Sequence, residues 1–234
     1  MEFALVFVNL KVPRGEPVTF EEMGRYAGEL AREGKIRGGA PLQPEEAGAR
    51  VSLRGGQAAV TDGPFAESKE FVGGFMIVDV ASRAEAIEVA KRCPATRSGI
   101  VEVRALPDRD AEGTAPGTSP RFMFLLYGEP GLTDPDGSKY QSMLAYDRTL
   151  KGEGCYVESS QLGQEPPAAR VELLGGRAVV TDGPFAETKE VAGGYYVVEA
   201  RSLADAIAVA KRCPAAHWGT IEVREVIKVP PPSA

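Results

Sequence analysis

The chain has 234 residues and a formal net charge of -6, with 43% hydrophobic and 26% charged residues. This is the composition of an ordinary globular protein, and the length favours two domains. The acidic balance, without any run of Lys and Arg, argues against binding to nucleic acid and to anionic membrane surfaces.

The three cysteines, Cys93, Cys155 and Cys213, are an odd number and include no Cys-x-x-Cys pair. This argues against a disulfide framework or a zinc ribbon and favours the reducing cytoplasm. The apolar start Met1–Val8 lacks a basic n-region, so it predicts a strand and not a signal peptide. No apolar stretch approaches the ~20 residues that span a bilayer.

In chain order, the pattern predicts an apolar strand at Phe3–Val8 and a helix at Thr19–Glu33. A hairpin follows, because the strand-like runs Arg50–Leu53 and Ala58–Thr61 flank Gly55-Gly56. The second half predicts the same elements in the same order. They are a strand at Phe122–Tyr127, a helix at Asp136–Lys151 and a hairpin around Gly175-Gly176.

A second helix in each half has the clearest signals. Ser82 and Ser202 each stand three residues before an acidic residue, close to the capping-box pattern. In the first half, small apolar residues then recur with the spacing of a half-buried helix, and Pro94 ends it. The sequence of each half therefore predicts the order strand, helix, strand pair, strand, helix and strand.

An internal repeat dominates the sequence. Residues 50–104 align without a gap with residues 170–224, at an offset of 120, and 34 of these 55 positions are identical. We expect a first copy at 1–106, a linker at 107–120, a second copy at 121–229 and a flexible tail at 230–234. The linker is rich in Asp, Gly, Thr and Pro, which suits an exposed connection.

The order of elements predicts an α+β fold in which an antiparallel sheet carries two helices on one face, the ferredoxin-like plan. The other face of such a sheet needs a cover. Two fused copies supply it within one chain, so we expect an intramolecular pseudo-dimer that packs sheet against sheet.

The segment Asp62–Glu70 followed by Gly73-Gly74-Phe75, and its repeat Asp182–Glu190 followed by Gly193-Gly194-Tyr195, resembles the DGPF branch of the YCII-related family. The resemblance covers both copies almost end to end. It implies tandem ferredoxin-like domains that form a dimeric α+β barrel. It also implies either a cleft with a His–Asp pair or a regulatory role beside extracytoplasmic-function sigma factors.

The chain departs from that family pattern at its histidine. His217 is the only one, and the first copy has Arg97 at the corresponding position. A histidine-dependent site in both copies is therefore excluded. His217 is either a structural residue or, if the second copy is the working half, an acid or base.

The Asp-Gly-Pro-Phe segment allows two interpretations. In the structural one, Gly63 and Pro64 form a turn and Phe65 fills the core. In the functional one, charged side chains surround a cleft where carboxylates transfer protons or bind a cationic group. The residues concerned are Asp62, Glu67 and Lys69 in the first copy and Asp182, Glu187 and Lys189 in the second. Asp182, Glu187 and His217 are the candidate catalytic residues.

The last strand of each copy alternates apolar residues with Glu and Arg, which places both charges on one face. The pairs are Glu102 with Arg104 and Glu222 with Arg224. They form either a structural ion pair or the lining of an anion pocket, with Arg as a fork for a carboxylate. Tyr195 is either a core residue or a pocket residue whose hydroxyl reaches a ligand.

Three classes of function stay open: a small-molecule binder or cofactor-free enzyme that uses the cleft, a regulatory module that contacts transcription machinery, and a fold kept for assembly. We favour the first. No P-loop, dinucleotide fingerprint, nucleophile elbow or metal-ligand cluster is present, so no cofactor or metal is expected. The candidate partners are a small-molecule ligand, a second copy of the chain or another protein.

Overall fold

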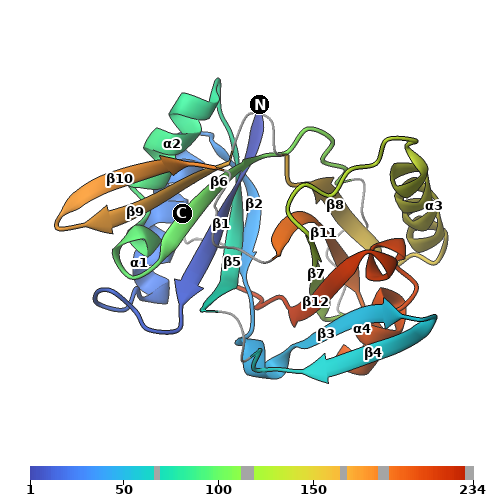
Figure 1. The fold of residues 1–234 in the computed structure, drawn as a ribbon. Helices are drawn as coiled ribbons and strands as arrows, with labels where there is room; N and C mark the ends of the chain where they lie inside the picture. Colours follow the sequence, from blue (N-terminus) through green and yellow to red (C-terminus); the bar gives the residue numbers. More distant parts are fainter. Residues whose placement is uncertain (66–68, 112–118, 164–167, 184–189, 230–234) are drawn as a thin grey trace.

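The computed structural model describes residues 1–65, 69–111, 119–163, 168–183 and 190–229. Within these residues the chain is an α+β protein with two six-stranded antiparallel sheets and four α-helices (Figure 1). The first copy contains β1 (Glu2–Leu10), α1 (Phe20–Arg32), β2 (Ile36–Pro41), β3 (Ala49–Arg54), β4 (Gln57–Asp62), β5 (Glu70–Asp79), α2 (Arg83–Lys91) and β6 (Ile100–Ala105).

The second copy repeats this order. It contains β7 (Arg121–Gly128), α3 (Ser138–Gly152), β8 (Tyr156–Gln161), β9 (Ala169–Leu174), β10 (Arg177–Asp182), β11 (Val191–Glu199), α4 (Leu203–Ala210) and β12 (Gly219–Glu225). The strands β2 and β8, which directly follow the first helix of each copy, were not predicted from the sequence.

The caps and turns follow the local sequence signals. The hydroxyls of Ser82 and Ser202 accept hydrogen bonds from the backbone N–H groups three residues later, and so begin α2 and α4. Gly55 and Gly56 have φ values of 58° and 79°, the left-handed backbone that a tight hairpin needs. The predicted helices and hairpins are therefore confirmed.

The two copies exchange their hairpins. The first sheet has the order β10-β9-β6-β1-β5-β2, so the second copy's β9–β10 hairpin extends the first copy's sheet. The second sheet has the order β4-β3-β12-β7-β11-β8, so the β3–β4 hairpin extends the second copy's sheet. Figure 1 shows the orange β9–β10 hairpin beside the blue and green strands, and the cyan β3–β4 hairpin beside the red ones.

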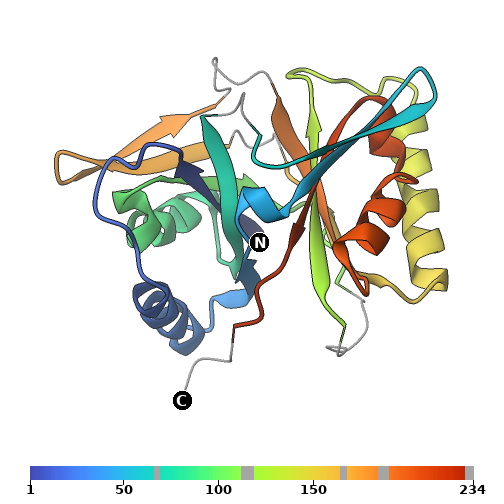
Figure 2. The same ribbon diagram turned by 90° about the horizontal axis from the view of Figure 1, so that it is seen from below.

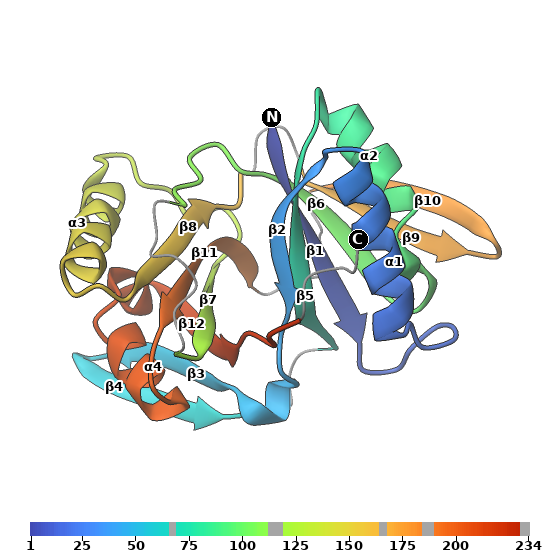
Figure 3. The same ribbon diagram turned by 180° about the vertical axis from the view of Figure 1, so that it is seen from behind.

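Each sheet carries its helices on the outer face and meets the other sheet with its inner face (Figures 2 and 3). On β1, Phe3 and Leu5 pack under α1 and α2, whereas Ala4 and Val6 belong to the core between the sheets. This alternation is the period of two that a strand buried on both faces must satisfy. The predicted packing of sheet against sheet is confirmed.

Two isolated bridges, Leu42 with Val226 and Asp110 with Ser159, link the two halves at the sheet edges. Among the described residues no continuous strand ladder joins the two sheets, so they do not close into one barrel. Cys93 and Cys213 are buried free thiols, as expected for structural cysteines. Within the described ranges no helix is both long and apolar enough to cross a membrane. Most of the expected linker, 112–118, and the tail 230–234 lie outside the described residues.

Candidate functional site

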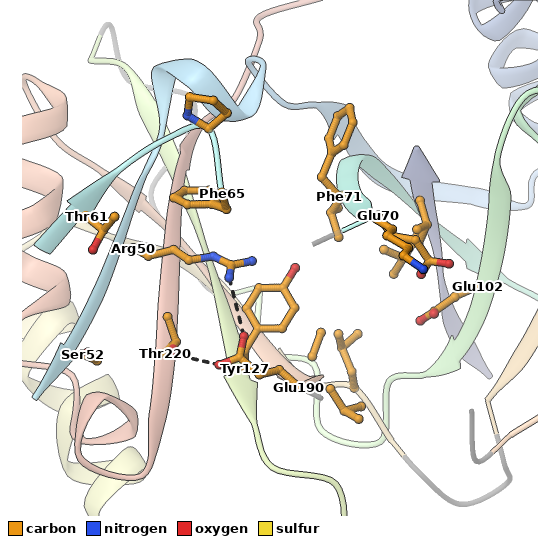
Figure 4. Close-up of a pocket in the computed structure, with 18 of the residues that line it drawn as sticks. Arg50, Ser52, Thr61, Phe65, Glu70, Phe71, Glu102, Tyr127, Glu190 and Thr220 are labelled. Carbon is orange, nitrogen blue, oxygen red and sulfur yellow. Dashed lines mark hydrogen bonds and ion pairs between the residues drawn. The ribbon is translucent and has the colours of Figure 1, made fainter. Parts of the chain in front are cut away.

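A cleft of about 980 Å³ lies between the two sheets. One wall comes from β3, β4, β7 and β12, and the other from β1, β5, β6 and β9. Figure 4 shows Arg50, Phe65 and Tyr127 on the first wall, facing Phe71 and Glu102 on the second. The cleft therefore has walls from both copies.

Strand periodicity brings the charged side chains into this cleft. On β3, Arg50 and Ser52 face the cleft, while the intervening Val51 is fully buried in the core under the helices. On β6, Glu102 and Arg104 face the cleft, while Val103 is buried on the opposite face. The predicted placement of Glu and Arg on the inner face is thus observed.

Two reciprocal ion-pair networks cross between the copies. Arg50 of the first copy donates to Glu222 of the second, with Nε···Oε2 and Nη2···Oε2 distances of 3.1 and 2.9 Å. A carboxylate oxygen of Glu190 lies 3.6 Å from Nη1 of Arg50. Each exchanged hairpin thus brings an arginine to two glutamates of the other copy.

The network around Arg170 mirrors the one around Arg50, at an offset of 120. Arg170 of the second copy donates to Glu102 at 2.9 Å and to Glu70 at 2.9 and 3.2 Å. Burial alone would lower the pKa of Arg170, but Glu102 and Glu70 hold it above its usual value. The guanidinium is therefore a permanent cation.

The arginine of each final strand, Arg104 on β6 and Arg224 on β12, is buried. Arg224 is fully buried, donates to Glu222 at 2.8 Å and donates to the Gln43 carbonyl. Arg104 instead lines the cleft and donates to the carbonyls of Leu162 and Ala192 at 2.9 and 3.0 Å. Its burial lowers its pKa. The two halves of the molecule are therefore similar but not equivalent.

Aromatic rings support the Arg50 side of the cleft. The Arg50 guanidinium carbon lies 4.4 Å from the centre of the buried Phe65 ring and 5.3 Å from that of Tyr127. Burial raises the pKa of Tyr127 well above its usual value, with Glu222 as the next cause. Its hydroxyl therefore stays protonated near neutral pH and is available as a hydrogen-bond donor.

The Asp-Gly-Pro-Phe turn packs closely against the segment before β3. A Cβ atom at Gly63 would lie 1.8 Å from the Glu45 carbonyl oxygen, so only glycine fits there. The Phe65 carbonyl accepts from the Lys11 ammonium at 2.6 Å, and Lys11 also pairs with Glu45 at 3.1 Å. These contacts hold the buried Phe65 in the wall of the cleft, against the Arg50 guanidinium.

Two cations at the mouth of the cleft differ from the ion-paired arginines. Arg54 and Lys69 both line the cleft and are exposed. Within the described part of the chain, neither makes an ion pair, whereas Arg50, Arg104 and Arg170 all have glutamate partners. The net positive charge of the lining therefore comes from these two residues.

Comparison with known proteins identifies the family. The sequence model of the YCII-related domain matches residues 14–108 and again 121–230. The chain belongs to the YCII-related domain family. Over 77 residues it is 42% identical to an uncharacterized protein of Rhizobium meliloti (strain 1021), a match that covers 31% of this chain and 60% of that protein.

The structure gathers some of the residues that the YCII-related resemblance and the residue patterns singled out. Lys69, Glu102 and Arg104 line the cleft, and Glu222 with Arg224 lies directly behind it, in contact with Arg50. Glu102 and Arg104 lie on β6, and Glu222 and Arg224 lie on β12, strands that are central in their respective sheets. Their role in binding stays a prediction.

Other predicted site residues lie elsewhere. Asp62 and His217 are exposed outside the lining of the cleft, and Asp182 is exposed and pairs with Arg83. Tyr195 is buried between the sheets, 5.7 Å from Phe75 between ring centres. Three further predicted residues lie outside the described residues: Glu67, Glu187 and Lys189.

Sequence reasoning missed the residues that join the two copies. Arg50 and Arg170 looked like ordinary strand charges, and Glu70 and Glu190 looked like the ends of the motif. The available signal was that each residue is identical to its partner at the offset of 120. No group of three or more His, Cys, Asp or Glu side chains suited to a metal ion occurs in the part of the chain that is described.

Proposed function

We propose that this YCII-related protein binds a small organic anion with an apolar body in the cleft between its sheets. The observation that carries the proposal is the charge arrangement of the lining. Three arginines are matched by glutamates, and Arg54 and Lys69 have no acidic partner among the described residues.

The size and lining of the cleft support a small organic molecule. Ligand pockets commonly measure about 300–1,000 Å³ and combine apolar walls with a few placed polar groups. Here the volume is about 980 Å³, and Val8, Val72 and Leu162 supply apolar surface below the charged rim. An apolar body fits the walls, and an anionic group fits the mouth.

The internal ion pairs make the site rigid. A half-buried arginine that already has two carboxylate partners is held in one orientation, so little ordering is needed when a ligand binds. Arg50 and Arg170 each have two such partners. Their role in this proposal is to shape the cleft, while Arg54, Lys69 and the Tyr127 hydroxyl contact the ligand.

The test is isothermal titration of the full chain with benzoate, and with benzylamine as the cationic counterpart. We expect binding of benzoate alone. Lys69→Met should weaken it about fivefold, as expected for the loss of roughly 1 kcal/mol from an exposed charge. Lys211→Met, an exposed position outside the cleft lining, is the matched control.

Equal binding of benzylamine, or no binding of benzoate in the millimolar range, would contradict the proposal. Mass spectrometry of the recovered ligand distinguishes a binder from an enzyme, because only an enzyme returns an altered molecule.

A further inference from the structure

The two exchanged hairpins present equivalent rows of side chains to the interior, but the rows differ in chemistry. The β3 row is Arg50, Ser52 and Arg54. At the offset of 120, the corresponding positions on β9 carry Arg170, Glu172 and Leu174. The inner arginine is common to both rows, whereas the two outer positions change from Ser and Arg to Glu and Leu.

The cleft follows only one of these rows. Arg50, Ser52 and Arg54 all line it, together with Ala59 and Thr61 of the neighbouring β4. From β9, in contrast, Arg170 alone is part of the lining, and nothing from β10 is. Among the described residues, the two pseudo-equivalent hairpins therefore contribute unequally to this cleft.

A loop of the first copy contacts the β9 row. Residues 11–19 connect β1 to α1, and Arg14 within them forms an ion pair with Glu172 on β9. The corresponding residues 129–137 of the second copy instead begin their own helix. The Asp134 carboxylate there accepts from the backbone N–H groups of Lys139 and Tyr140 at 3.1 and 2.8 Å.

The charges of the two rows also favour an anion at the β3 row over the β9 row. The β9 row has an anion, Glu172, that is already neutralised by Arg14. The β3 row has a cation, Arg54, for which no ion pair exists within the described ranges. Since four strand residues span about 13 Å, the distance from Arg50 to Arg54 suits a molecule of one or two rings.

We propose that each chain binds one aromatic carboxylate along the β3 row and none along the β9 row. Arg54 binds the carboxylate, Ser52 leaves room beside it, and the rings of Tyr127 and Phe71 contact the aromatic body from opposite walls (Figure 4). This assignment rests on the proposed function. It adds the number of sites per chain, the hairpin that carries the site and the class of ligand.

The test exchanges the outer positions between the two rows. In the full chain, Ser52→Glu with Arg54→Leu copies the β9 row onto β3. Glu172→Ser with Leu174→Arg makes the reverse change and is the matched control. Titration uses 2-naphthoate as the aromatic carboxylate and hexanoate as the aliphatic one. Arg54→Leu alone replaces the first double variant if that variant does not fold.

We expect one 2-naphthoate per wild-type chain, bound more tightly than hexanoate. The β3 double variant should bind it at least about tenfold more weakly, as expected from the loss of one charge-assisted contact and the gain of a repelling carboxylate. Arg54→Leu alone should weaken it about fivefold, and the β9 double variant, in which the β3 row is unchanged, should keep the β3 site with wild-type affinity.

The possible failures are distinguishable. Two sites per chain, equal affinity for hexanoate, or unchanged affinity in the β3 variant would overturn this inference. After any of these three results, the proposed function would still stand if Lys69→Met weakens the binding of anions. If the wild-type chain binds no carboxylate, both the proposed function and this inference are wrong.

Discussion

The buried carboxylate of Glu222 is expected to stabilise the fold much more than its repeat partner Glu102. Glu222 is 1% exposed and accepts hydrogen bonds from Arg50 and from the fully buried Arg224. Replacing it with Gln leaves the fully buried Arg224 without this carboxylate and leaves Arg50 with Glu190 alone, at 3.6 Å. Breaking a buried ion pair in this way costs about 3–5 kcal/mol.

Glu102 provides a matched comparison within the same chain. It faces the cleft, lies 3.5 Å from Arg104, and shares Arg170 with Glu70. Water in the cleft and the second carboxylate both reduce the loss, so Glu102→Gln should cost about 1–2 kcal/mol.

Urea unfolding followed by tryptophan fluorescence and circular dichroism measures both free energies of unfolding. The expectation is wrong if Glu222→Gln and Glu102→Gln lower the free energy of unfolding equally, or if Glu222→Gln lowers it by less than about 1 kcal/mol. Either result would show that the deeper burial of Glu222 does not make its ion pairs more important for stability.

Two further predictions concern stability. The buried Tyr195 hydroxyl lies beside Arg109 and Glu158 without a well-formed hydrogen bond to either, so Tyr195→Phe should leave the free energy of unfolding within about 1 kcal/mol of the wild-type value; a larger loss in urea unfolding would contradict this. A hydrogen bond from Arg92 lowers the pKa of Glu33 from 4.5 to about 2. The stability that Glu33 contributes is therefore present above pH 4.5 and lost as the pH falls towards 2. Glu33→Gln should flatten this acid-induced loss in urea midpoints measured across that interval, and an unchanged slope would contradict the assignment.

Local signals in the sequence predicted the elements well. Ser82 and Ser202 identified the starts of two helices, and Gly55-Gly56 identified a hairpin, because caps and tight turns depend on a few neighbouring residues. The repeat, together with the need to cover an apolar sheet face, predicted that the two sheets pack against each other. The inward direction of Glu222 and Arg224 followed from strand periodicity.

The exchange of hairpins was not predictable in the same way. Local patterns do not show whether β3 pairs with β6 of its own copy or with β12 of the other, since both strands contain the same Glu-Val-Arg sequence. For the same reason, Arg50 could not be linked to Glu222, which is 172 residues away. The cleft depends on this long-range pairing, so its lining was only partly anticipated.

Covalent fusion changes what a mutation does to a molecule with two similar sides. In a symmetric dimer of identical chains, one codon specifies both sides of the axis, so every change occurs twice. Here, positions 52 and 172 are encoded separately, and they carry Ser and Glu. One side is free to acquire a chemistry that would be harmful on the other, while the reciprocal arginines still require both copies to be present. Duplication and fusion therefore allow the two sides of this architecture to differ, which a symmetric dimer of identical single-copy chains does not allow.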